Sequence, residues 1–232
     1  MALVKYGGGV LDARGSIGGQ VHSRNRFGNY IRARTTPVNP ASTRQNLVRA
    51  CIQLLSQAWS NVLTQAQRDV WEVYADAIVR VNKLGAQIKL TGFNHYIRAN
   101  APRLQAVGSR IDAGPTTLTL PPGDPQMIAT VDEAGQEISV AFDDTLDWLD
   151  QDDAHMLVYM SEPKATGVNF IGGPFRYAGR LDGDSVTPLT SPQVLTAPFT
   201  VAEGQQVVVR ARISEEDGRL SDLFRHQSAV TA

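Results

Sequence analysis

Apolar residues recur every three or four positions between residues 41 and 63, the spacing that places them on one side of an α-helix. Ser42 and Gln45 form a capping box just after Pro40, which is typical of a helix start. The pattern therefore predicts one helix from Ala41 to about Leu63. Its expected buried stripe is Leu47, Ala50, Cys51, Leu54, Leu55, Ala58 and Val62.

Two further helices are predicted before residue 110. Thr64 and Gln67 form a second capping box, and almost no loop separates this start from the first helix, so we expect an antiparallel helical hairpin. The apolar face of the second helix is expected to be Val70, Trp71, Tyr74, Ala77, Ile78 and Val81. A third, shorter helix should begin at Thr91 and be interrupted or ended by Pro102, because proline lacks an amide hydrogen.

From residue 125 onward the helical spacing gives way to alternation, the pattern of half-buried β-strands. The predicted strands are Gln126–Asp132, Glu137–Phe142, His155–Met160, Phe175–Leu181, Gln205–Ile213 and Leu223–Val230. Six or seven short strands separated by glycine-bearing turns predict a β-sandwich of immunoglobulin or fibronectin type III kind. The segment Val207–Phe224 also resembles the last hairpin of a fibronectin type III domain.

The first 40 residues contain seven glycines and show no helical periodicity. Each glycine raises the entropic cost of ordering the chain. Residues 21–34 nevertheless alternate between small or apolar side chains and arginines. We expect a hairpin or extended arm, with its turn or bulge at residues 26–29.

These patterns together predict a multidomain α+β chain. Its expected parts are an extended basic glycine-rich arm (1–40), a helical domain (41–110), a linker (111–124) and an Ig/fibronectin III-like β-sandwich (125–232). With 232 residues, 42% of them hydrophobic, the chain can bury a core. One cysteine excludes an intramolecular disulfide, and no stretch approaches the roughly 18 apolar residues of a membrane helix, so we expect neither a membrane span nor an export signal.

Charge divides the chain into opposite halves. Residues 1–110 carry 15 basic and four acidic residues, a net charge of +11, whereas residues 111–232 carry seven and 19, a net charge of −12. Such an asymmetry of charge is informative about the binding partners of a protein more than about its fold. Copies of the chain could attract one another head to tail, or the basic half could face another anionic molecule.

No catalytic, cofactor or metal constellation emerges from the sequence. The four histidines, at positions 22, 95, 155 and 226, lack partners at metal-ligand spacing. The acidic run 143–153 lacks the glycine and glutamate of an EF-hand loop, so we expect a solvated loop, with an irregular calcium site or a contact with a basic partner as alternatives. The glycine clusters lack the context of a phosphate loop. We therefore expect a protein that is not an enzyme and uses no cofactor.

The arm holds the most informative side chains. Seven arginines lie between residues 14 and 49 with no acid among them. They could neutralise nucleic-acid phosphates while aromatic rings stack on bases, or they could pair with carboxylates of a neighbouring subunit. The preference for arginine over lysine favours the fixed bidentate pairs of protein assembly. The candidate partner-binding residues are Arg14, Arg24, Arg26, Phe27, Tyr30, Arg32 and Arg34.

The run from Gly15 to Ala50 resembles the N-terminal region of small proteins encoded among the structural genes of tailed bacteriophages and prophages. In these proteins a glycine-rich Arg/aromatic arm ends in Pro-x-Asn-Pro, here Pro37 to Pro40, and passes into a Gln/Arg-containing helix. The stretch TGFNHYIRAN, residues 91–100, is similar to a second recurring piece of such proteins. The resemblance implies a structural protein of the virion, acting in capsid decoration or in head–tail or tail assembly.

This interpretation makes the partners other virion proteins and further copies of the chain, with a homo-oligomer expected and a DNA contact possible. Two alternatives stay open: a nucleic-acid-binding protein that uses the basic arm, and host or glycan adhesion through the sandwich. Adhesion would need an exposed aromatic platform, for which Trp148 and Phe170 are the candidates. We expect both rings to be core residues instead.

Overall fold

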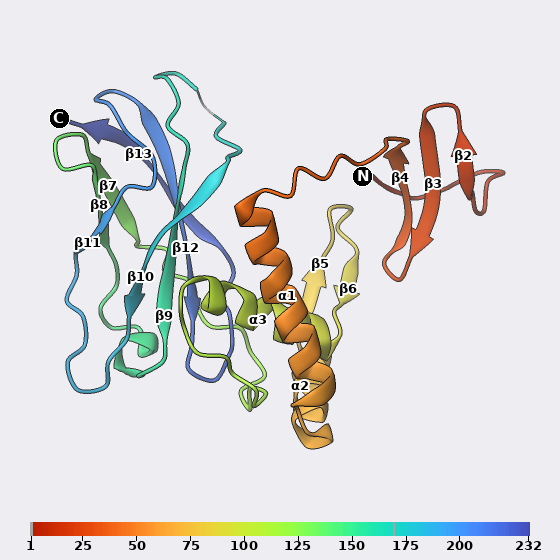
Figure 1. The fold of residues 1–232 in the computed structure, drawn as a ribbon, viewed down its shortest axis with the longest axis horizontal. Coiled ribbons are helices and arrows are strands. Elements are labelled where there is room, and N and C mark those ends of the chain that lie inside the picture. The colour runs from red at the N-terminus through yellow and green to blue at the C-terminus, as the bar shows by residue number, and fades with distance from the viewer. Residues whose placement is uncertain (1, 169) are drawn as a thin grey trace.

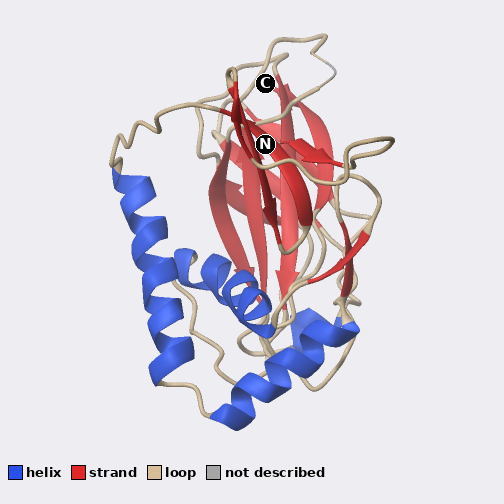
Figure 2. Ribbon diagram, turned by 90° about the vertical axis from the view of Figure 1, so that its right-hand side faces the viewer, coloured by secondary structure: helices blue, strands red, loops and turns tan. Residues whose placement is uncertain are grey.

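The computed structural model describes residues 2–168 and 170–232 and shows three parts in chain order (Figure 1). A small N-terminal sheet is followed by three helices with a short hairpin, and then by a large sheet. The expected α+β class is confirmed at this level. Figure 2 shows the helices gathered along one side and one end of the large sheet.

The N-terminal residues form a four-stranded antiparallel sheet and not a bare arm. Its strands are β1 (Ala2–Val4), β2 (Gly15–Ile17), β3 (Gln20–Asn25) and β4 (Gly28–Ala33), in the order β1-β4-β3-β2. The predicted hairpin is confirmed, with Arg26 and Phe27 as its turn. Gly28 has φ +120°, and the side-chain oxygen of Asn25 accepts a hydrogen bond from the Phe27 amide at 2.9 Å.

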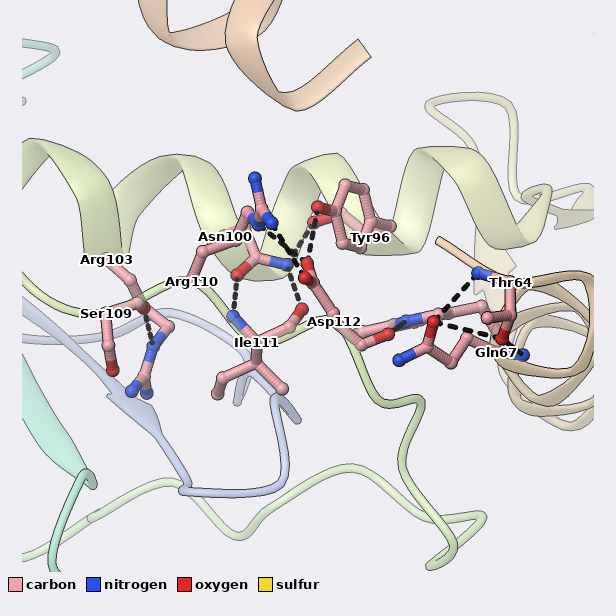
Figure 3. Close-up of polar contacts among 10 residues, drawn as sticks. Thr64, Gln67, Tyr96, Asn100, Arg103, Ser109, Arg110, Ile111 and Asp112 are labelled. Atoms are coloured by element: carbon pink, nitrogen blue, oxygen red, sulfur yellow. Dashed lines mark hydrogen bonds and ion pairs between the residues drawn. The ribbon is translucent and has the colours of Figure 1, made fainter. Parts of the chain in front are cut away.

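The three helices begin at the predicted caps. They are α1 (Thr43–Asn61), α2 (Gln65–Ala77) and α3 (Gly92–Gln105). Thr64 and Gln67 make both bonds of a capping box (Figure 3). A Cβ atom on Gly92 would lie 2.7 Å from the backbone nitrogen of Glu72, so only glycine allows α3 to start this close to α2. The buried side chains between the helices include Leu55, Trp71, Tyr74 and Tyr96.

Two expectations about helix ends are wrong. Helix α3 continues through Pro102 to Gln105, because its last turn is held by other bonds, including that from the Gly108 amide to the Arg103 carbonyl at 2.8 Å. Helix α2 stops at Ala77, before Val81. The residues after it form β5 (Val79–Val81), which pairs with β6 (Gln87–Lys89).

The apolar stripe predicted for α1 is only partly buried. Leu55 and Ala58 lie in the helical core, but Leu47 and Leu54 are 53% and 49% exposed. The first half of α1 extends beyond the other two helices (Figure 1). Of the predicted stripe in this half, Leu47 and Ala50 are exposed, and Cys51 packs against the helical core.

The large sheet has seven strands in the order β10-β9-β12-β13-β7-β8-β11. They are β7 (Ile128–Asp132), β8 (Glu137–Ala141), β9 (His155–Ser161), β10 (Phe175–Asp182), β11 (Gln193–Thr196), β12 (Gln206–Ser214) and β13 (Phe224–Thr231). The six predicted strands match within two residues, and β11 was not predicted. Ile138 from β8 and Val209 from β12 share one core with Trp148, so both halves of the sheet face the same interior.

The segment 111–124 was expected to be a linker, but its first two residues are hydrogen-bonded to helix α3. The side chain of Asn100 in α3 accepts a hydrogen bond from the Ile111 amide at 2.7 Å and donates one to the Ile111 carbonyl at 3.0 Å (Figure 3). The Tyr96 hydroxyl donates to Asp112 at 3.1 Å. Residues 111 and 112 therefore belong structurally to the helical part.

Candidate interaction surface

Strand pairing divides the candidate arginines between the two faces of the N-terminal sheet. Cross-strand partners share a face. Arg32 pairs with Val21 on the face that also carries Tyr30, whereas Arg24 lies on the opposite face beside Asn29. Arg26 sits in the turn. The sheet therefore presents positive charge on both faces, and the candidate residues do not form one cluster.

The candidate arginines in the hairpin are exposed. Arg24, Arg26, Arg32 and Arg34 have no carboxylate within 4 Å in the described part of the chain. Arg14 pairs with the neighbouring Asp12 at 3.1 Å. The carboxylates expected to neutralise these side chains are thus not supplied within the same molecule.

The two candidate aromatic residues are half-buried. Tyr30 lies opposite Leu3 on β1. Phe27 lines a groove of about 300 Å³ between the N-terminal sheet and the β5–β6 loop, where Asn82 and Ala86 form the other wall. No hydrogen bond joins residues 2–34 to the rest of the described chain.

Residues 2–54 form regular secondary structure but contribute no fully buried side chain to a hydrophobic core. From residue 2 to residue 54, all of which the structure describes, no side chain is buried, and the first buried one is Leu55. This stretch holds four strands and the first half of α1. Apolar residues exposed on α1 include Leu47, Ile52 and Leu54. We call residues 2–54 the uncovered segment.

The helical part is, in contrast, firmly attached to the large sheet. Arg103 in α3 is fully buried and donates hydrogen bonds to Ser214 Oγ at 3.0 Å and to the carbonyls of Ser109, Asp153 and Glu215 at 3.2, 2.7 and 3.3 Å. Arg80 and Arg98 pair with Asp222 in the loop before β13. The opposite charges of the two halves therefore meet here, at residues that sequence reasoning missed.

Burial shifts several pKa values at this junction. Desolvation, together with the smaller effects of the nearby Arg98 and Arg80, lowers the pKa of His95 to about 4. Burial also lowers the pKa of His155, although its Nδ1 atom lies 2.9 Å from Asp182, which raises the pKa. Both imidazoles are thus held in the neutral form by the packing between helices and sheet.

The remaining candidates fall into simple structural roles. Trp148 is buried against Phe142, as expected, whereas Phe170 is 82% exposed and the expectation that it is a core residue is wrong. Within the described residues no three His, Cys, Asp or Glu side chains gather as metal ligands. No described helix combines the length and the apolar character that crossing a bilayer requires.

Comparison with known proteins adds little. No family model matches the sequence, and no curated protein is similar enough to count as a relative. Among solved structures, a family 76 glycoside hydrolase from a bovine Bacteroides thetaiotaomicron strain is similar over 49% of this chain and 21% of the hydrolase, with 18% identity and a TM-score of 0.33. A likeness this slight carries no argument about fold or activity.

Proposed function

We propose that this chain is a non-enzymatic structural protein of a tailed-phage virion that joins neighbouring subunits through its uncovered segment. The observation that carries this proposal is that residues 2–54 form four strands and the first half of a helix, although none of their side chains is fully buried. Ordered structure normally requires buried apolar surface to offset its conformational entropy. A neighbouring molecule that packs against residues 2–54 would bury their apolar side chains and so offset this entropy.

The surface chemistry of the segment supports a protein neighbour. Exposed apolar residues of α1 supply hydrophobic contact, and the arginines supply charge-assisted hydrogen bonds to carboxylates. The half-buried rings of Phe27 and Tyr30 are suited to anchor the contact, as aromatic residues do at interface centres. The edge strands β1 and β2 leave backbone groups that a neighbouring strand can pair with. The acidic half of another copy offers matching carboxylates.

We infer that the large sheet is an Ig/fibronectin III-like module that projects from this contact. Its strand order supports the inference: β10, β9, β12 and β13 follow the C′-C-F-G arrangement of such domains, and β7, β8 and β11 follow A-B-E. The shared core around Trp148 agrees with two layers packed face to face. Modules of this kind serve as spacers and contact surfaces in many assemblies, a role at the level of fold alone.

A nucleic-acid contact is the second candidate, and the exposed arginines on both faces of the N-terminal sheet favour it. Binding of the full chain to random duplex DNA would distinguish the two, because phosphate contacts make affinity fall steeply with salt. Assembly predicts no DNA binding at about 0.15 M salt. Tight binding with a steep salt slope would favour the nucleic-acid role instead.

Incorporation into particles tests the proposal directly. Tagged full-length protein, a variant lacking residues 1–40, and Lys83→Gln are produced during phage growth and quantified in purified virions. Lys83 is an exposed basic residue outside the uncovered segment, so its variant is the matched control. We expect the full-length protein and Lys83→Gln in virions, and the truncated variant folded but below about a tenth of that level. Equal incorporation of the truncated variant, or absence of the full-length protein, would overturn the proposal.

A further inference from the structure

A second surface feature lies outside the uncovered segment, on the face of the large sheet turned toward the helices. There a cavity of about 220 Å³ opens between the end of α3 and strands β9, β10 and β12. Its lining residues are Pro102, Tyr159, Phe175, Arg210, Arg212 and Leu223. The volume is smaller than the roughly 300–1,000 Å³ of sites for drug-sized ligands, so it suits a compact molecule.

The strand register brings the polar and aromatic groups of this cavity together. Arg210 and Arg212 are two positions apart on β12, so both side chains stand on the same face of the sheet. Arg210 lies directly opposite Tyr159 on β9. On its other side, Arg210 lies opposite Arg225 of β13, which adds a third positive charge beside the cavity.

The Arg210 side chain is held in a fixed orientation. Its guanidinium carbon sits 3.6 Å from the centre of the Phe175 ring, a cation–π stack that covers one face of the group. The N–H donors of a stacked guanidinium point outward from its edge. Its Nε atom is buried and has no hydrogen-bond partner among the described residues. An unsatisfied buried donor is costly unless a ligand accepts from it.

The positive charge of the cavity is not neutralised within the molecule. No acidic residue lines it, and in the described chain neither Arg210 nor Arg212 has a carboxylate within 4 Å. Burial and the nearby Arg225 lower the pKa of Arg210, which agrees with a guanidinium lacking an anionic partner. This is unusual in a half of the chain that carries a net charge of −12.

We propose that this cavity is a binding site for a small organic oxyanion with a flat apolar body, such as an aromatic carboxylate or a phosphate monoester. The oxyanion accepts hydrogen bonds from the edges of Arg210 and Arg212, which match its geometry. The flat body packs between Tyr159 and the apolar walls formed by Pro102 and Leu223. The ligand can be a free small molecule or the C-terminal aromatic residue of a partner chain.

The test uses the full chain and measures binding by the NMR signals of its arginine Nε–H groups. The probes are benzoate and phenyl phosphate for the free molecule, N-acetylphenylalanine for a C-terminal residue, and benzyl alcohol as the neutral analogue. We expect saturable shifts of the Arg210 signal with at least one anion below about 20 mM, and none with benzyl alcohol. The anion that binds most tightly shows whether the ligand is a free small molecule or the C-terminal aromatic residue of a partner chain.

Substitutions of single arginines distinguish specific binding of the anion in the cavity from nonspecific attraction to positive charge. Arg210→Gln, in which binding is followed by the Arg212 signal, should weaken binding at least about tenfold, and Arg212→Gln, followed by the Arg210 signal, provides a second variant should the first fail to fold. Arg176→Gln is the matched control, because Arg176 also stacks on an aromatic ring, Phe199 at 4.3 Å, but lies outside the cavity. The proposal is overturned by no saturable shift with any anion, by equal binding of benzyl alcohol, or by unchanged affinity in both cavity variants.

Discussion

His95 shows how a single buried residue couples the helical core to pH. It is 3% exposed and packs edge-on against Tyr74, with ring centres 5.3 Å apart. Its pKa of about 4 in the folded chain lies below the value near 6.5 of an unfolded chain. The unfolded state therefore binds the proton first as pH falls. The stability contributed by neutral His95 is fully present above pH 6.5 and is lost toward pH 4.

We predict that the His95→Phe variant has a shallower pH dependence of stability than the wild type. The wild type should lose up to about 3 kcal/mol from this residue between pH 6.5 and 4, which the variant does not lose. Urea unfolding over that pH range measures the difference. His22→Gln, which removes an imidazole from the N-terminal sheet, is the control and should keep the wild-type slope. An equally steep slope in His95→Phe would contradict the assignment.

At the scale of single residues, the sequence indicated candidate residues but not the neighbours that surround them in the fold. The candidate aromatic and arginine positions were visible as a pattern, yet their division between two faces depends on which residues pair across the hairpin. Arg103 gave no signal at all, because its four acceptors come from segments 6 to 112 residues away in the chain. The alternate spacing of Arg210 and Arg212 within a predicted strand places both on one face, a signal that our interpretation of the sequence did not use.

The two helix caps make a prediction at the scale of the element. Thr64 closes a full capping box before a helix whose Trp71 is fully buried, whereas Ser42 accepts one bond of 3.4 Å before the exposed half of α1. Thr64→Ala should therefore cost about 1–2 kcal/mol of unfolding free energy, and Ser42→Ala only about 0.5 kcal/mol. Thermal and urea unfolding measure both. An equal cost would mean that the start of α1 belongs to the folded core.

Elements with strong local signals were predictable and short ones were not. The helices were predicted from their caps and period, and six of the seven strands of the large sheet from alternation and turns. Strands β1, β2, β5 and β11 have three or four residues each, too few to show a period. The stop expected at Pro102 failed because other backbone bonds, such as that from the Gly108 amide to the Arg103 carbonyl, hold the last turn of α3. The exposure of the α1 stripe could not be predicted, since it depends on what packs against it.

On the scale of the whole molecule, the chain divides into a well-packed body and an uncovered segment. The body consists of the second half of α1, helices α2 and α3, and the large sheet, and the helices are joined to the sheet through Arg103 and the Asp222 ion pairs. The charge asymmetry of the sequence led us to expect contacts with partners, and the structure shows that some of the opposite charges meet inside one molecule, at Asp222. In the proposed assembly, the neighbour contacts the uncovered segment, which holds the N-terminal sheet with its exposed arginines and the first half of α1.

Hydrogen exchange of the backbone amides tests the central claim most directly, because it reports whether the N-terminal sheet is stable without a neighbour. In the dilute monomer we expect amides of β3 and β4 to exchange almost unprotected, while those of β9 and β12 stay protected. In intact virions the same β3 and β4 amides should exchange at least about 100-fold more slowly. Protection of β3 and β4 in the monomer as strong as that of β9 and β12 would contradict the account.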